Sequence, residues 1–163
     1  MLKPLEQFIC DSCGQVIRSK EEGWIEWLGT YDPRKYRAFK IVHHKTASPL
    51  RRADGCYHYE DDPGRMDEHL NDFADANVAY NLLFWIDEGP HISPDFECPF
   101  VTDLREWAEL TKRLLLPYYE EARFYINTAI ADDFIDDPGN PHYLYSVSVL
   151  RQIAEKYSEH NAD

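Results

Sequence analysis

The hydrophobic positions of the first 60 residues occur in short runs that predict β-strands. Phe8-Ile9 and Val16-Ile17 flank a tight turn, and residues 24–28 are rich in β-forming side chains. Residues 36–44 carry apolar side chains at both odd and even positions, which favours a central strand covered on both faces. A last short strand is expected over residues 56–59. The pattern predicts an antiparallel sheet of three to five short strands.

The spacing of apolar residues after residue 60 is helical. Met66, Leu70 and Phe73 are expected on one face of a short helix, and Asp75 is expected to cap a second helix that ends at Gly89-Pro90. The remaining apolar stripe, near residues 150–157, predicts a final helix.

A longer helix is expected to begin at Asp103. Glu106 lies three residues later, which is the spacing of a capping box in which Asp103 is the N-cap. The helical stripe continues to Ala129, and Pro117 removes one backbone donor within it, so we expect a kink or two helices in tandem. Tyr119 and Phe124 fall outside the main stripe, which is consistent with a surface for a protein partner or a homodimer; a helix packed between the sheet and neighbouring helices is an equally good interpretation.

These elements predict an α+β fold: a small antiparallel sheet with a zinc knuckle, followed by an α-helical half. Residues 1–60 are expected to form a zinc-ribbon-like β subdomain, with residues 61–163 packed on it as one compact unit. The chain has 163 residues, of which 44% are hydrophobic and 14% aromatic, and this composition is typical of a folded domain. No apolar run reaches the ~18–20 residues of a membrane span, and the first residues lack the apolar core of a signal peptide, so we expect a cytoplasmic protein.

Charge is distributed unevenly along the chain. The formal net charge is −13. Residues 1–59 contain ten Lys and Arg against seven Asp and Glu (+3), and residues 60–163 contain seven against 23 (−16). An acidic second half repels a polyanion, so nucleic acid is not an expected partner, and any such contact would have to use the basic first half.

The strongest chemical signal is Cys10-x-x-Cys13-Gly14. Two intervening residues allow two thiolates to bind one tetrahedral zinc ion, and glycine after the second cysteine can adopt the positive φ of a sharp turn. The remaining ligands must come from residues further along the chain. We expect His44 and Cys56 to complete a structural zinc site with Cys10 and Cys13; the alternatives, which strand alternation does not separate from them, are His43 and His58.

Other interpretations of the cysteines are less well supported. A thioredoxin-like pair would have to begin a helix, which the residues after Cys13 do not predict, and a disulfide is disfavoured without a secretory signal. Ordinary buried cysteines remain an alternative. Cys98 stands alone, and we assign it no role.

An enzymatic interpretation rests on Val42-His43-His44. This segment has a partial likeness to HNH-type nucleases, in which one histidine activates water and another binds a catalytic cation. That pattern needs an Asn followed at short spacing by a second metal-binding histidine, but residues 44–58 contain no Asn, and Asn71, Asn77 and Asn81 come late without a matching histidine. A calcium loop, a Ser-His-Asp arrangement and a Gly-rich phosphate loop are also absent, so no catalytic residue is assigned, and an enzyme is the less favoured interpretation.

Several segments together resemble a group of small bacterial proteins, without known activity, that begin with a zinc-ribbon-like Cys-x-x-Cys-Gly element. The resemblance is carried by residues 8–14, 23–27, 39–44 and 55–59. It implies a bacterial, cytoplasmic, zinc-binding protein and supports Cys10 and Cys13 as ligands. It implies no reaction, because zinc ribbons serve nucleic acids, proteins and stability alike.

Overall fold

The computed structural model describes residues 1–89, 99–135 and 141–158. It contains α-helices together with two small antiparallel sheets, so the α+β prediction is confirmed. The strands are β1 (Phe8–Ile9), β2 (Val16–Ile17), β3 (Gly23–Tyr31), β4 (Arg34–His43) and β5 (Arg65–His69). The α-helices are α1 (Leu70–Phe73), α2 (Val78–Ile86), α3 (Leu104–Leu115), α4 (Tyr119–Ala122), α5 (Ile126–Ala131), α6 (Pro141–Leu144) and α7 (Val147–Ser158), and two 3-10 turns are η1 (Lys20–Glu22) and η2 (Lys45–Ala47).

The larger sheet has the strand order β4-β3-β5, so β3 is its central strand. The prediction that residues 36–44 form the central strand is therefore wrong. This segment, β4, is apolar at both odd and even positions for another reason: Phe39 packs on Trp85 of α2 and Trp107 of α3, with ring centroids 5.6 and 5.3 Å away. An edge strand covered by helices thus has the residue pattern of a central one.

Two other predicted elements differ in the structure. Met66 belongs to β5, where it pairs with Trp27, and the helix α1 begins only at Leu70. A strand that leads directly into one helical turn produces the same spacing as a single short helix. Residues 56–59 do not form a strand, because the backbone N–H of His58 donates to the Glu26 carboxylate (2.8 Å) and not to a neighbouring strand.

The beginning of α3 confirms Asp103 as an N-cap, whose carboxylate accepts hydrogen bonds from the backbone N–H groups of Arg105 (2.8 Å) and Glu106 (3.1 Å). The Glu106 side chain does not complete a capping box, since it accepts from the backbone N–H of Ala38 (2.7 Å). The stripe around Pro117 is divided into the successive helices α3, α4 and α5, and Tyr118 between the first two has φ +67°. None of the described helices is both long enough and apolar enough to cross a membrane.

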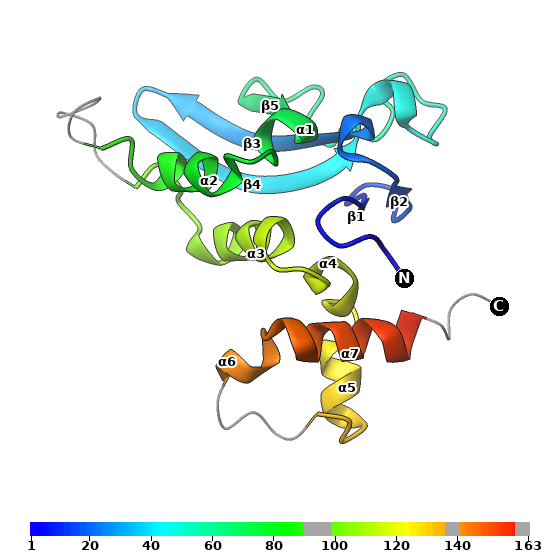
Figure 1. Cartoon of the computed structure of the whole chain (residues 1–163). Coiled ribbons are helices and arrows are strands. Elements are labelled where there is room, and N and C mark those ends of the chain that lie inside the picture. The colour runs from blue at the N-terminus through cyan, green and yellow to red at the C-terminus, as the bar shows by residue number, and fades with distance from the viewer. Residues whose placement is uncertain (90–98, 136–140, 159–163) are drawn as a thin grey trace.

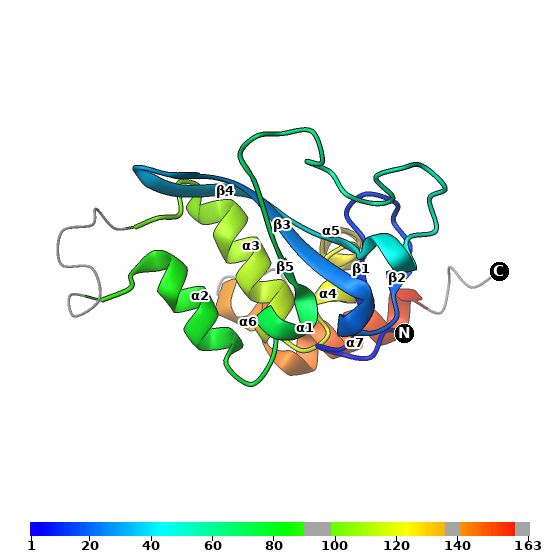
Figure 2. The same cartoon turned by 90° about the horizontal axis from the view of Figure 1, so that it is seen from above.

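The elements are stacked in layers. In Figure 1 the larger sheet lies at one end, α2 and α3 lie beneath it, and α5 to α7 form the other end; Figure 2 shows α2 and α3 side by side. The buried side chains form two clusters, one built on the sheets with α1 to α3 and one built on α4 to α7. Along the chain the first cluster ends at Leu114 and the second begins at Tyr119, and the first contains residues from both sides of residue 60.

Candidate metal centre

Three cysteines and one histidine converge at the end of the larger sheet that faces β1 and β2. One ligand atom from each of Cys10, Cys13, His43 and Cys56 lies within 4.8 Å of the other three. They come from three separate segments: the turn between β1 and β2, the last residue of β4, and the loop before β5. Three of the four side chains are buried, and Cys13 is half-buried. This group could hold a metal ion.

The turn that carries the first two cysteines is fixed by its own backbone. The N–H of Gly14 donates to the carbonyl of Cys10, and the N–H of Cys10 donates to the carbonyl of Gln15, both at 2.9 Å. Gly14 has φ +72°, the left-handed conformation that its position after the second cysteine predicts. The turn therefore presents both thiols on one side before any ion is bound.

The imidazole of His43 is oriented by a second contact. Its Nε2 lies 3.2 Å from the carbonyl oxygen of Val16, which can only accept, so this nitrogen carries the proton. Its Nδ1 then presents a lone pair 3.5 Å from Cys13 Sγ and 3.8 Å from Cys56 Sγ. A hydrogen bond that fixes the non-ligating nitrogen is the usual support of a metal-binding histidine.

His44 and His58 lie outside this group. Nδ1 of His44 is 2.7 Å from Thr46 Oγ1, and its ring lies 5.0 Å from that of Trp24. Nδ1 of His58 is 3.4 Å from Ser12 Oγ. The structure thus brings together the three predicted cysteines with the alternative His43 in place of His44. The reason is direction: His43, the last residue of β4, faces the thiols, and the chain turns away after it.

Burial changes the acid–base chemistry of the thiols. It raises the pKa of Cys13 to about 12, and it also raises the pKa of Cys56. Without a metal these thiols are therefore protonated at neutral pH. A metal ion binds thiolates and must displace the protons, so the affinity of the group for a metal falls as the pH falls.

The donor set fits zinc better than harder cations. Sulfur and imidazole nitrogen are the ligands of structural zinc sites, among which three cysteines with one histidine is a common set, whereas magnesium and calcium take oxygen. Cys10, Cys13 and Cys56 are free of disulfides. The pair Cys10 and Cys13 is followed by strand β2 and not by a helix, unlike a thioredoxin-like motif. Cys98 lies outside the described residues.

The turn of the first two cysteines is held by a buried ion network that the spacing of residues along the chain does not predict. The Asp11 carboxylate accepts from the backbone N–H of Ile41 and from Arg113 Nη1, each at 2.7 Å. Arg113 Nε donates to Glu120 at 2.7 Å, and the carboxylate of Glu120 accepts from the N–H of Ile9 (2.9 Å). The network therefore joins the turn to α3 and α4. The available signal was an arginine three residues after Leu110, next to the apolar stripe of α3.

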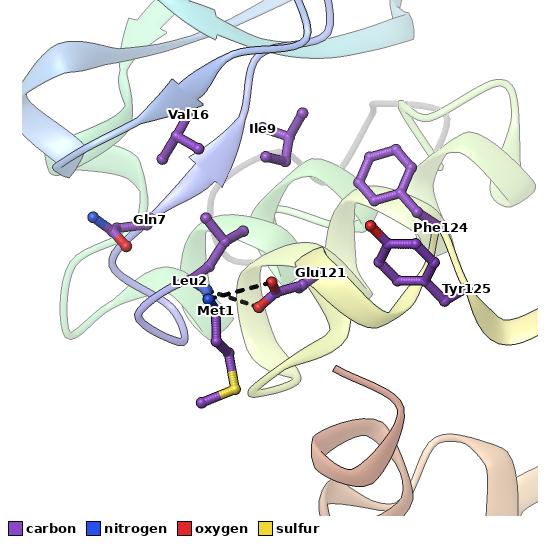
Figure 3. A pocket seen from close by; sticks show the side chains of 8 residues that line it. All are labelled: Met1, Leu2, Gln7, Ile9, Val16, Glu121, Phe124 and Tyr125. Carbon is purple, nitrogen blue, oxygen red and sulfur yellow. Dashed lines mark hydrogen bonds and ion pairs between the residues drawn. The ribbon is translucent and has the colours of Figure 1, made fainter. Parts of the chain in front are cut away.

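A hollow lies on the other side of the β1–β2 hairpin (Figure 3). It has a volume of about 380 Å³, and Ile9 and Val16 of the hairpin face Phe124 and Tyr125 across it. Phe124 is 52% exposed, as its position outside the main stripe predicts. The same argument predicts that Tyr119 lies at a surface, and this prediction is wrong: Tyr119 is buried, and its hydroxyl donates to Glu109 at 2.6 Å.

The two adjacent histidines offer a direct test of the site. We expect His43→Asn to lower zinc affinity at least about tenfold, because one of four ligands is lost, while His44→Asn leaves it within about twofold. Competition with a chromophoric chelator at pH 7.5 measures both affinities. Equal losses in the two variants would mean that His43 is not a ligand.

The histidines also bear on the nuclease alternative. In an HNH-type site one of them would have to face substrate. Here Nδ1 of His43 faces two thiols, and His44 is hydrogen-bonded to Thr46 and packs on Trp24. The geometry gives that alternative no support.

Comparison with family models, with curated proteins and with solved structures finds no match to this chain.

Proposed function

We propose that the chain is a non-enzymatic zinc protein whose metal is structural and whose role is to bind another protein. The observation that carries the zinc assignment is the convergence of Cys10, Cys13, His43 and Cys56. Four protein ligands complete the tetrahedral coordination of a zinc ion and leave no position for water or substrate, which is the arrangement of a structural site. The ion would supply cross-linking of the chain and no chemistry.

The sheets of the first half explain why a metal would be needed. β1 and β2 have two residues each, and an isolated hairpin of that size is not stable in water. Zinc bound by Cys10, Cys13, His43 and Cys56 would join this hairpin to β4 and to the loop before β5. Binding of a structural zinc contributes ~10 kcal/mol or more, comparable with the whole stability of a domain.

The interaction role is supported by large apolar side chains on the surface. Tyr80 and Leu83 of α2 are 58% and 67% exposed, and Phe124 lines the hollow of Figure 3. Tyr80 and Leu83 lie together on one helix, and exposed apolar groups that lie together are typical of a contact surface. The β1–β2 hairpin, which zinc would order, supplies Ile9 and Val16 to the hollow that Phe124 lines. Loss of the metal would therefore disturb this hollow as well.

Two measurements test this function. Elemental analysis of the untagged chain should give about one zinc per chain, and X-ray absorption should show three sulfur ligands and one nitrogen with no added oxygen. A tagged, zinc-loaded chain should then retain a protein from an extract of its source or a second copy, and Cys13→Ser should not, whereas the surface control Arg151→Met should.

The opposite outcomes are equally defined. Oxygen in the metal shell would show an open site and favour chemistry. Retention of DNA or RNA at low salt, without a protein, would favour the nucleic-acid alternative, which the −16 charge of residues 60–163 disfavours. A chain that is monomeric and retains no protein would contradict the interaction role and leave the metal assignment intact.

A further inference from the structure

A second hollow lies beside α2. Figure 2 shows α2 at the edge of the molecule, next to α3. The hollow has a volume of about 250 Å³. Four of its six lining residues are aromatic, one is an amide and one is an acid: Phe73, Tyr80, Phe84, Trp85, Asn81 and Glu68.

The aromatic side chains are held in place from within the core. Trp85 and Phe73 are almost fully buried, and their ring centroids lie 4.8 Å apart. Tyr80 and Phe84 lie one helical turn apart on α2, with centroids 5.8 Å from each other. The amide of Asn81 donates to the carbonyl of Phe73 at 2.8 Å, which fixes α2 against α1. The hollow is therefore part of the folded structure and needs no rearrangement to exist.

The acid in this hollow, Glu68, lies near two other acidic residues, Asp72 and Asp75. Glu68 is half-buried on β5, and none of the ion pairs among the described residues includes it. Burial, together with the charges of Asp72 and Asp75, raises its pKa. Lys20, a basic group near this region, donates its ammonium to the carbonyl of Ala74 (2.5 Å). A carboxylate in this position is stabilised by any cation that enters.

We propose that this hollow binds a lysine or arginine side chain of a partner protein. Aromatic rings attract an ammonium or guanidinium group through their negative faces, and the Glu68 carboxylate supplies the opposite charge. The volume lies below the ~300–1,000 Å³ of pockets for whole small-molecule ligands, and it suits a single side chain. The long aliphatic stem of either residue can pack on Tyr80 and Phe84 while its charge meets Glu68.

The surroundings favour a peptide over a free amine. Leu83, 67% exposed, is on the same helix as Tyr80 and offers an apolar contact for a residue that flanks the bound cation. The charge of residues 60–163, −16, would attract a basic segment and repel a second copy through the same region. The inference rests on the proposed interaction role and adds to it the chemistry of the partner.

The test uses the full, zinc-loaded chain labelled with ¹⁵N and three capped tripeptides: Leu-Lys-Leu, Leu-Arg-Leu and Leu-Gln-Leu. We expect the two basic peptides to shift the Trp85 indole and the amides of α2, with dissociation constants at least about fivefold lower than that of the glutamine peptide. Glu68→Gln should remove this preference. Asp132→Asn, which changes the net charge equally at a distant exposed site, should retain it.

Each contrary result has one meaning. Shifts elsewhere, or equal affinity for all three peptides, would overturn the cation site. Butylammonium binding as tightly as the lysine peptide would overturn the peptide as ligand. Because protein retention in the previous experiment does not depend on these peptides, a partner that binds the wild-type chain and Glu68→Gln equally would refute this site while the proposed interaction role stands.

Discussion

Cys10→Ser is expected to lose both its zinc and its cooperative unfolding transition. The substitution leaves Cys13, His43 and Cys56 as three ligands around an ion that needs four. The β1–β2 hairpin, with two residues in each strand, then loses its metal link to β4. Since zinc contributes ~10 kcal/mol or more to such sites and a domain has only about 5–15 kcal/mol in total, the loss should exceed any single substitution in the core.

The measurement combines metal content by elemental analysis with thermal unfolding followed by circular dichroism. Cys56→Ser should behave like Cys10→Ser, because Cys56 is fully buried in the same group. Ser12→Ala is the matched control: it lies in the same turn but is no ligand, and it should retain one zinc and a cooperative transition. A Cys10→Ser chain that keeps one zinc per chain and its melting temperature would show that the metal is bound elsewhere or by other residues.

The cysteine turn was predictable because all the relevant information is local. The two cysteines, the glycine after them and the short apolar pairs on either side fix the turn within ten residues. Gly14 has the positive φ that this position needs, and β1 and β2 are paired as expected, with Phe8 opposite Ile17. The N-cap at Asp103 is local in the same sense and was predicted correctly.

The choice between His43 and His44 as ligand depends on residues that are distant in the sequence. Ile41, Val42 and His43 are all buried, so the alternation that separates the two faces of a strand is missing at this end of β4. Only the position of Val16, 27 residues earlier, shows which ring faces the thiols, because its carbonyl lies beside His43 Nε2. The order of strands was hidden for a similar reason, since β5 joins the sheet from a segment with helical spacing.

The network around Arg113 depends on contacts across a hundred residues and could not be derived from spacing. Arg113 Nη1 reaches Asp11, and Arg113 Nη2 donates to the carbonyl of Ile9 at 3.0 Å. Although burial lowers the pKa of Arg113, the carboxylates of Glu120 and Asp11 raise it above its usual value, so the guanidinium is charged at every pH at which the chain folds. It is a permanent positive charge between two acids, at the junction of the two cores.

Arg113→Met should therefore be the most damaging substitution outside the metal ligands. It leaves the side chain of Glu120, only 7% exposed, as a buried carboxylate without its bidentate partner. Breaking such a buried pair from one side costs about 3–5 kcal/mol, which urea unfolding in the presence of excess zinc would measure.

The same variant should bind zinc about 10–100-fold more weakly, because Asp11 loses the contact that holds the cysteine turn against α3. Arg151→Met is the matched control, since its ion pair with Glu155 at 2.7 Å is exposed and of the weak i,i+4 kind, and it should change stability by about 0.5 kcal/mol or less. If both variants lost equally little, the network would be a consequence of the packing of α3 and α4 and not its cause. A loss of stability with unchanged zinc affinity would separate the two roles, and would show that the metal site is held by its own turn alone.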